Sequence, residues 1–387
     1  MKKRFILALG IFFFAAVFIT SISIHAVSAK EIRVGVLIPL SGYISFFGKM
    51  QETALNIAKE EFKEMGPAAG FDLTFILYDT GSKPKDAILM AQKLMHTDKV
   101  HVIIGPFLST VCEQVFPIVN RAKVPIITAS SAKPGITKAN RPWTFRNIMT
   151  SDKINDPTVR AWTSNNNVKT VAILTDIKSK VSEIYGKNVA PALLKKYGVK
   201  IVESIDFVTE DVDFSAQITK VKGTNPDGIV LAGEYHLAAN IAREARKQGL
   251  KQPFVGDVPI TSDGFCKLGG DAVEGTYAAT DFWTGNPDPK VRSFIKKFHE
   301  IYPKDKLPHT TTAAMYDTLY ITRDIVAKMG LSGEPGDLQK DREKIRDGWA
   351  NLKDYPGLSK TTIDENGEAV KDYYTLVVKD GKWIRIN

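Results

Sequence analysis

The residues best suited to chemistry in this sequence are hydroxyl side chains that follow two short apolar runs in its first half. The run Val102–Ile104 is followed by Ser109, and the run Val124–Ile127 is followed by Ser130 and Ser131. Runs of this length and branching are typical of buried parallel strands. In an open parallel sheet, small ligands bind where strands end, because hydroxyls, backbone N–H groups and helix N-termini meet there. The pattern therefore predicts half of a cradle for a small ligand.

The same hydroxyl residues also suit purely local roles. Ser109 fits the N-cap of a helix over Thr110–Arg121, and Thr128–Ser131 fits a turn, because Ser and Thr favour both positions. The residue types alone leave both interpretations open.

Motifs of enzymes and metal sites are missing from the sequence. The histidines have no H-E-x-x-H or other metal-ligand spacing, and there is no G-x-S-x-G elbow, P-loop or G-x-G-x-x-G after a strand. The segment Asp364–Glu368 is too short for a calcium loop, and its Asn366-Gly367 pair fits a hairpin turn. We therefore expect no catalytic residue, no metal and no cofactor.

Composition narrows the class of protein further. The formal net charge of +9 is spread over a chain in which lysines are scattered among acids, so no basic stripe marks a nucleic-acid surface. The only cysteines, Cys112 and Cys266, make no disulfide framework. We expect two separate thiols, although an oxidising compartment permits a bond between them.

The N-terminal segment has the order of a secretory signal. Lys2, Lys3 and Arg4 precede an apolar run over Phe5–Ile24, and small residues lead to Ala29. We expect cleavage after Ala29, which places the mature protein in the periplasm or outside the cell. An apolar run of this length also fits an uncleaved membrane anchor. No cysteine lies near the boundary, so a lipid-anchored form is not expected.

Strand and helix patterns alternate through most of the remaining chain. The expected strands are Ile32–Pro39, Phe71–Tyr78, Val102–Ile104, Val124–Ile127, Val168–Leu174, Val199–Phe207, Gly228–Ala232 and Phe254–Gly256. The expected helices are Gln51–Glu64, Lys85–His96, Thr110–Arg121, Tyr185–Tyr197, Phe214–Lys222, Leu237–Lys247, Asp288–Ile301 and Thr310–Met329. This order predicts an α/β fold of two doubly wound parallel sheets with right-handed crossovers. A mature chain of about 358 residues also fits two domains better than one.

Five segments resemble, in order and spacing, the periplasmic solute-binding proteins of ABC transporters, in the branched-chain amino acid (Leu/Ile/Val) binding family. They are IRVGVLIPLSGYISFFG, VHVIIGPFLST, VPIITASSAKP, FRNIMTSD and IDENGEAVKDYYTLVVKDGKW. The resemblance covers nearly the whole mature chain. It implies a type I clamshell of two lobes with three crossings, near Asn147–Asp152, Thr276–Asp281 and Gly357–Ile363. Lobe one would take residues 30–149 and 281–357, and lobe two residues 150–280 and 358–387.

The resemblance also implies a function. Such a protein binds a small carboxylate-bearing solute, most typically an amino acid, between its lobes and delivers it to the membrane subunits of an ABC permease. It would act as a monomer, without cofactor or nucleic acid. Two alternatives remain open: a ligand sensor that signals to a membrane receptor, and a binder of an organic acid or amide that lacks an ammonium group.

Lobe one of such a family holds the ligand carboxylate. The positions that match are Ser109, Ser130, Ser131 and Ala132. Family members commonly have a threonine where Ala132 stands, so one hydroxyl is missing here. Phe47 stands where the family often has a tyrosine and would line the apolar side of the pocket.

Lobe two would add aromatic walls and an acid. The aromatic positions that match are Tyr185 and Tyr235. In amino acid binders an acid after the short strand pairs with the ligand ammonium group. Asp257 is the nearest acid here, one position from the expected place, and it also suits a plain turn. The family's lobe-one disulfide is missing, because Ser82 and Leu108 stand where its cysteines would be.

Overall fold

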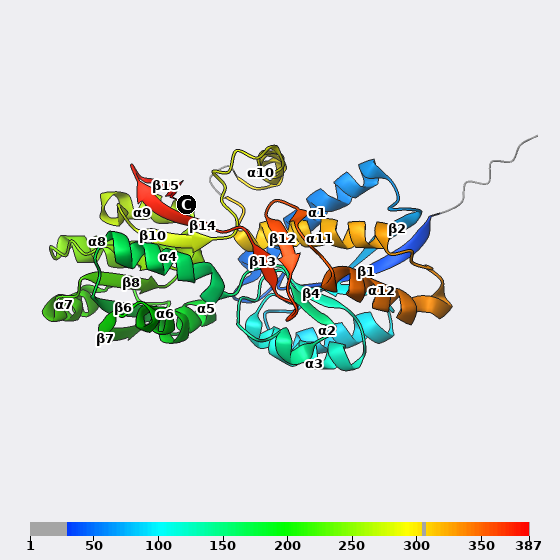
Figure 1. The fold of residues 1–387 in the computed structure, drawn as a ribbon, viewed down its shortest axis with the longest axis horizontal. Helices are drawn as coiled ribbons and strands as arrows, with labels where there is room; N and C mark the ends of the chain where they lie inside the picture. Colours follow the sequence, from blue (N-terminus) through cyan, green and yellow to red (C-terminus); the bar gives the residue numbers. More distant parts are fainter. Residues whose placement is uncertain (1–28, 304–306, 387) are drawn as a thin grey trace, which may run out of the picture.

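The computed structural model describes residues 29–303 and 307–386 and contains two large sheets with helices on both faces (Figure 1). Apart from Ala29, the expected signal segment lies outside the described residues. Within the described part, no helix has the length and apolar character needed to cross a membrane. The two sheets lie side by side along the long axis of the molecule (Figure 1).

The first sheet is parallel throughout, with five strands in the order β2-β1-β3-β4-β5. Its strands are β1 (Lys30–Ile38), β2 (Phe71–Asp79), β3 (Val102–Ile104), β4 (Ile126–Thr128) and β5 (Thr144–Arg146). Alternate residues of β1 point to opposite faces, so Val36 enters one core and Leu37 another. The core around Val36 is shared with α1 (Ser45–Met65), α10 (Pro289–Ile301), α11 (Thr310–Lys328) and α12 (Leu338–Ala350). The core around Leu37 is shared with α2 (Pro84–His96) and α3 (Ser109–Arg121).

The second sheet has seven strands in the order β15-β14-β10-β9-β8-β6-β7, parallel except at β14 and β15. Its strands are β6 (Thr170–Asp176), β7 (Lys200–Phe207), β8 (Gly228–Ala232), β9 (Phe254–Gly256), β10 (Tyr277–Thr280), β14 (Tyr374–Lys379) and β15 (Lys382–Arg385). One face packs on α4 (Ser151–Asn165), α5 (Lys180–Ile184) and α6 (Ala190–Lys196). The other packs on α7 (Ser215–Thr224), α8 (Tyr235–Lys247) and α9 (Asp263–Gly269). The expected α/β class with two doubly wound sheets is therefore confirmed.

Helix α4 is the longest element that the sequence pattern did not predict. Its sequence, SDKINDPTVRAWTSN, contains Pro157 and many Asn, Ser and Thr residues, all of which lower helix propensity. Val159 and Trp162 are nevertheless buried against the second sheet. Tertiary burial therefore outweighs local propensity in this helix.

A small antiparallel sheet lies between the two large ones (Figure 1). Its strands are β11 (Tyr355–Pro356), β12 (Lys360–Ile363) and β13 (Ala369–Lys371), and the β12–β13 turn contains the expected Asn366-Gly367 pair. Ile363 and Ala369 are buried in the core of the first sheet. The chain therefore joins the second sheet only at β14, later than the expected crossing near Gly357–Ile363, because the hairpin buries its apolar residues in the first core.

The two cysteines are buried thiols in different cores. Cys112 belongs to the core under α3, and Cys266 to the core of the second sheet beside α9. The expectation of two separate thiols is confirmed.

Candidate functional site

The predicted hydroxyl residues lie together at the carboxyl edge of the first sheet. The Oγ atoms of Ser109 and Ser131 are 2.8 Å apart. Thr128, at the end of β4, donates to the Pro106 carbonyl (2.7 Å) and accepts the Ser131 backbone N–H (3.1 Å), so it holds the two strand-end loops together. We call Ser109, Ser130 and Ser131 the hydroxyl cluster.

The hydroxyl cluster lies at the positive end of helix α3. Leu108, not Ser109, occupies the N-cap position, so the local role expected for Ser109 as a cap is not seen. The backbone N–H groups of Ser109 and Thr110 have no acceptor among the described residues. Unpaired N–H groups at a helix N-terminus favour a bound anion.

Gln51 is a buried member of this site that the sequence did not single out. Its side chain is 2 % exposed, and its Nε2 donates to Ser130 Oγ (2.8 Å) and to the Thr311 carbonyl (3.2 Å). It therefore joins the hydroxyl cluster to helices α1 and α11. The sequence feature that could have predicted its burial is its place on the face of α1 that also carries the buried Ala54 and Leu55.

An aromatic wall stands beside the hydroxyl cluster and consists of Phe47, Phe107 and His309. The Phe47 ring centroid lies 5.8 Å from that of Phe107 and 5.2 Å from that of His309. All three side chains are partly exposed. Phe47 was predicted here, whereas Phe107 and His309 were not.

A buried arginine that the sequence did not single out lies behind the loop that carries the hydroxyl cluster. The Arg146 side chain is fully buried, and its Nη2 donates to the Lys133 carbonyl (2.6 Å). Glu368 lies 3.8 Å from the same nitrogen. Burial lowers the pKa of Arg146 and the Glu368 carboxylate opposes that shift. A guanidinium in this place favours an anion at the loop above it.

Ala132 connects the two halves of the site through Ser151. The Ala132 carbonyl accepts the backbone N–H of Ser151 (3.2 Å), the first residue of α4. The Ser151 hydroxyl in turn donates to Asp257 Oδ2 (3.2 Å). Asp257 thus lies two hydrogen bonds away from the loop of the hydroxyl cluster.

Asp257 is buried at the end of β9 and has no described cation as partner. Its side chain is 4 % exposed and also accepts Asn155 Nδ2 and the Val258 N–H, each at 2.7 Å. Burial raises the pKa of Asp257, and these neutral donors oppose that shift. The carboxyl group is therefore well placed to gain from a cationic partner.

Two more acids lie at the ends of neighbouring strands, and neither was predicted. Asp176 is the last residue of β6 and accepts Thr209 Oγ1 (2.7 Å) and the Lys178 N–H (2.9 Å). Glu234 follows β8 and accepts Ser179 Oγ at 3.4 Å. Burial, then the charges of Asp176 and Asp257, raise the pKa of Glu234 to about 7. We call Asp176, Glu234 and Asp257 the carboxylate cluster. The sequence feature that could have predicted this cluster is an acid at or just after the end of each strand.

The structure places the two predicted tyrosines differently. Tyr185 is fully buried in a core of the second sheet, and its hydroxyl has no partner among the described residues. Burial, followed by the charge of Asp257, raises the pKa of Tyr185 well above its usual value. Tyr235 is the first residue of α8, is partly exposed, and packs its ring edge against His236 at 5.4 Å. Only Tyr235 therefore presents a surface from which a ligand could be contacted in this conformation.

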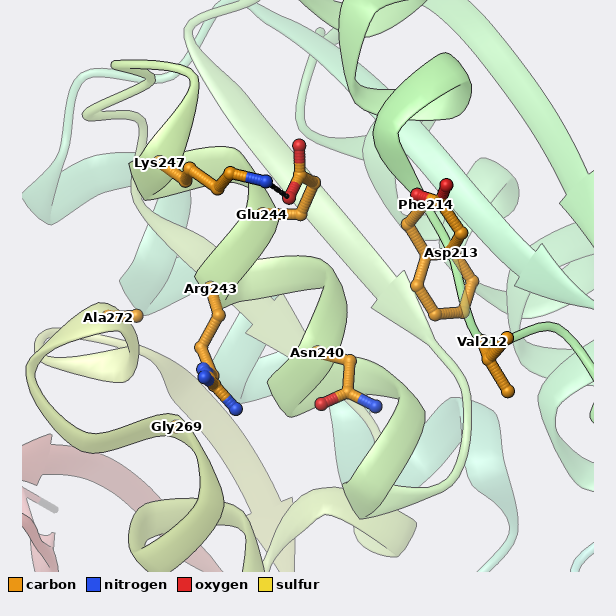
Figure 2. Close-up of a pocket in the computed structure, with 9 residues that line it drawn as sticks. All are labelled: Val212, Asp213, Phe214, Asn240, Arg243, Glu244, Lys247, Gly269 and Ala272. Carbon is orange, nitrogen blue, oxygen red and sulfur yellow. Dashed lines mark hydrogen bonds and ion pairs between the residues drawn. The ribbon is translucent and has the colours of Figure 1, made fainter.

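No predicted site residue lies in the surface hollow shown in Figure 2, which has a volume of about 530 Å³ and lies along α8, between residues 212–214 and the end of α9. Its only ion pair in the figure joins Lys247 to Glu244 at 3.2 Å. Among the described residues, no group of His, Cys, Asp and Glu side chains could hold a metal ion. The hollow is lined by Val212, Asp213, Phe214, Asn240, Arg243, Glu244, Lys247, Gly269 and Ala272.

Residues 31–382 match the family model described as periplasmic binding protein. The chain is also similar to the leucine-, isoleucine-, valine-, threonine- and alanine-binding protein of Pseudomonas aeruginosa. The two are 26 % identical over 289 residues, which are 74 % of this chain and 75 % of that protein.

Two solved structures have the same fold. One is a leucine binding protein from Thermotoga maritima, and the other is a branched-chain amino acid transporter substrate binding protein from Streptococcus pneumoniae in complex with isoleucine. Each is 26 % identical in sequence and matches with a TM-score of 0.76. Each match covers 92 % of this chain and 98 % of the other.

Proposed function

Because this chain belongs to the periplasmic binding protein family, we propose that it is a receptor that binds an amino acid between two lobes and delivers it to an ABC permease. The family consists of solute-binding receptors rather than enzymes. The amino-acid-binding names of the relatives described above support the same ligand class. One observation carries the proposal: Ser151 links the loop of the hydroxyl cluster to Asp257. The hydroxyl cluster suits an anion, and Asp257 is a buried carboxyl group without a described cationic partner.

The ligand carboxylate would bind the hydroxyl cluster. Ser109 can donate through its hydroxyl and its backbone N–H, and the Thr110 N–H lies at the same helix end. Hydrogen bonds of this kind to a charged group contribute about 1.5–3 kcal/mol each. Arg146 would support this loop from behind through its bond to the Lys133 carbonyl, with Glu368 3.8 Å away as the partner of its charge.

The ligand ammonium group would bind the carboxylate cluster, with Asp257 as its direct partner. Asp257 now accepts neutral donors only, so an ammonium group would supply the missing countercharge. Tyr235 and Phe47 would border the ligand from the two sides. Ala132 would contribute its backbone, since its methyl group cannot donate.

Lobe closure would bring the two clusters together. We assign residues 30–149 and 281–357 to lobe one and residues 150–280 to lobe two, as the resemblance implies, and divide residues 358–387, which the resemblance gives to lobe two, between the lobes. The hairpin of β12 and β13 would move with lobe one, because its apolar residues are buried there, and β14 and β15 with lobe two. A ligand that bridges both clusters favours the closed form by the contacts that it gains there.

Localisation and partners follow from the same proposal. Residues 1–29 would act as a cleaved signal, so that the mature protein works in the periplasm as a monomer. The membrane subunits of the permease would recognise the closed form.

Thermal unfolding with a panel of free amino acids, aromatic acids, amides and dicarboxylates tests this function. A ligand at 100 times its Kd stabilises the native state by about 2.7 kcal/mol, which shifts Tm by several degrees. We expect a selective shift with one chemical group of amino acids. A panel without any shift would contradict the proposal.

A second candidate ligand class is an organic acid or amide without an ammonium group. The hydrogen bonds of Asp257 favour it, because neutral donors from Ser151, Asn155 and Val258 already satisfy this carboxyl group without a cation. Titration with leucine and with 4-methylpentanoate, which lacks only the amino group, separates the two classes. Equal affinities would favour the second candidate.

A further inference from the structure

His309 lies at one end of the aromatic wall, and Gln51 and Thr311 link its segment of the chain to the hydroxyl cluster. Its ring contacts Phe47, and Thr311, two residues later, is joined by Gln51 to Ser130. Thr310 donates to Asp281, whose other oxygen accepts the Met149 N–H at 3.4 Å. His309 therefore lies between the carboxylate-binding loop and two of the segments that pass from one sheet to the other.

The hydrogen bonds of His309 leave one ring nitrogen available. His309 is the N-cap of α11, and its Nδ1 accepts the backbone N–H of Thr311 at 3.3 Å. Nδ1 also lies 3.0 Å from the Thr311 hydroxyl, which can donate to it; with Nδ1 accepting from Thr311, the ring proton of the neutral imidazole is on Nε2. No described residue accepts from Nε2, and the side chain is partly exposed. The cap bond also fixes the direction in which this N–H points.

We infer that His309 determines ligand specificity: its Nε2–H donates a hydrogen bond to an acceptor on the ligand side chain, whose apolar part lies against Phe47 and Phe107. The inference deepens the proposed function and rests on it. The preferred ligands are those whose side chain carries a hydroxyl, carbonyl or amide oxygen beyond an apolar portion. Purely aliphatic ligands would leave this donor without an acceptor, which disfavours them.

The aromatic wall makes this selection directional. Phe47 lies between Phe107 and His309, so the only polar atom that the wall presents is at the His309 end. The proposed carboxylate site begins at the other end, because Ser109 follows Phe107 by two residues and contacts Ser131. A side-chain acceptor is therefore recognised at a distance from the carboxylate and not beside it.

Matched pairs of ligands test the inference by titration calorimetry. The pairs are threonine with valine, asparagine with leucine, tyrosine with phenylalanine, and 4-hydroxybenzoate with 4-methylbenzoate; only the first member of each has the acceptor. We expect the wild-type protein to prefer the first member of the pair that it binds by about three- to tenfold, the value of one neutral hydrogen bond.

Two variants separate recognition from structural support. His309→Asn keeps an acceptor for the Thr311 N–H but removes the distal donor, so the preference should fall below about twofold while the second member of the pair binds as before. His309→Gln places an amide N–H near the position of Nε2 and should restore part of the preference.

The outcomes distinguish this inference from the function on which it rests. A wild-type protein that binds one pair without preference, or a His309→Asn variant that keeps the preference or weakens both members equally, overturns the role of His309 but leaves the receptor function standing. A protein that binds none of the eight probes and none of the wider panel overturns both.

Discussion

The carboxyl edges of the two large sheets have the same architecture and opposite chemistry. The first edge presents the hydroxyl cluster, a helix N-terminus and, behind them, the buried Arg146. The second edge presents three carboxyl groups, and no described cation pairs with Asp257. The folds of the lobes therefore say little about the ligand; under the proposed function, the residues at the strand ends would determine which ligand charges are bound.

The contrast also explains why neither edge is a complete site. The first edge alone would bind many anions, and the second alone would bind many cations. Ser151 bonds to Ala132 on one side and to Asp257 on the other, so one residue links the two edges. A zwitterion is the smallest ligand that satisfies both.

Among these substitutions, removing the charge of Asp257 should change ligand affinity most. Asp257→Asn is expected to weaken amino acid binding by about 2–4 kcal/mol, because a desolvated ammonium group would lose its countercharge. Titration calorimetry should show no comparable loss with the des-amino analogue. The exposed Asp380→Asn is the matched control in the same lobe. Unchanged amino acid affinity in Asp257→Asn would mean that the second edge does not recognise an ammonium group.

Removing a hydroxyl from the first edge should have the next largest effect. Ser109→Ala is expected to cost about 1–3 kcal/mol of binding free energy for any carboxylate ligand, because one bond to a charged group is lost. The exposed Ser164→Ala serves as control. If calorimetry gave the same Kd for wild type and Ser109→Ala, Ser109 would not belong to the site.

The crowding of acids at the second edge can be measured without ligand. The folded-state pKa of Glu234, about 7, lies above its ordinary value of 4.5. The folded protein therefore holds a proton that the unfolded chain releases as pH rises from 4.5 to 7, and stability is lost over that interval. Glu234→Gln should match the wild type near pH 4 and exceed it by up to about 2 kcal/mol at pH 8.

Urea unfolding at several pH values checks the Glu234 prediction. The exposed Glu210→Gln in the same lobe is the control. A stability difference that is the same at pH 4 and pH 8 would show that Glu234 is not crowded by its neighbours.

An ion pair between the lobes should have the smallest effect. Lys153 on α4 contacts Asp364 at 3.2 Å and Glu368 at 3.1 Å, both on the β12–β13 hairpin. Because closure would change this contact, Lys153→Met should raise ligand affinity by about two- to fivefold, within the range of a partly exposed pair. Lys196→Met, which removes a pair with Asp156 inside lobe two, should not.

The Lys153 prediction also depends on salt. High salt should raise the affinity of the wild type towards that of Lys153→Met, because screening weakens the same pair. A variant whose affinity and salt dependence equal those of the wild type would show that the pair survives closure.

The sequence predicted which hydroxyl residues gather at the strand ends of the first sheet. Ser109 and Ser131 follow buried apolar runs, and such runs are recognisable without knowing their neighbours. The order of elements was predictable for the same reason. Helix α4 was not, since burial of Trp162 outweighs the poor propensity of its sequence.

Side chains whose role depends on pairing across the fold could not be found in the same way. Gln51 and Arg146 are single polar residues within apolar patterns, and only the packed structure shows that they support the hydroxyl cluster. Tyr185 shows the opposite problem. Its place before Gly186 was recognisable, but the depth to which it is buried depends on how β6 and β8 pack against the helix.

The burial of Cys112 has a practical consequence for labelling chemistry. Its thiol is completely buried, and burial raises its pKa to about 12, while Cys266 is 6 % exposed. Maleimide dyes react with accessible thiolates, so Cys112 should remain unmodified near neutral pH. A single cysteine introduced in place of Ile177, which is 41 % exposed just after β6, would then take up the dye beside the carboxylate cluster. The protein can thus be made into a fluorescent reporter of its own ligand with both native cysteines in place.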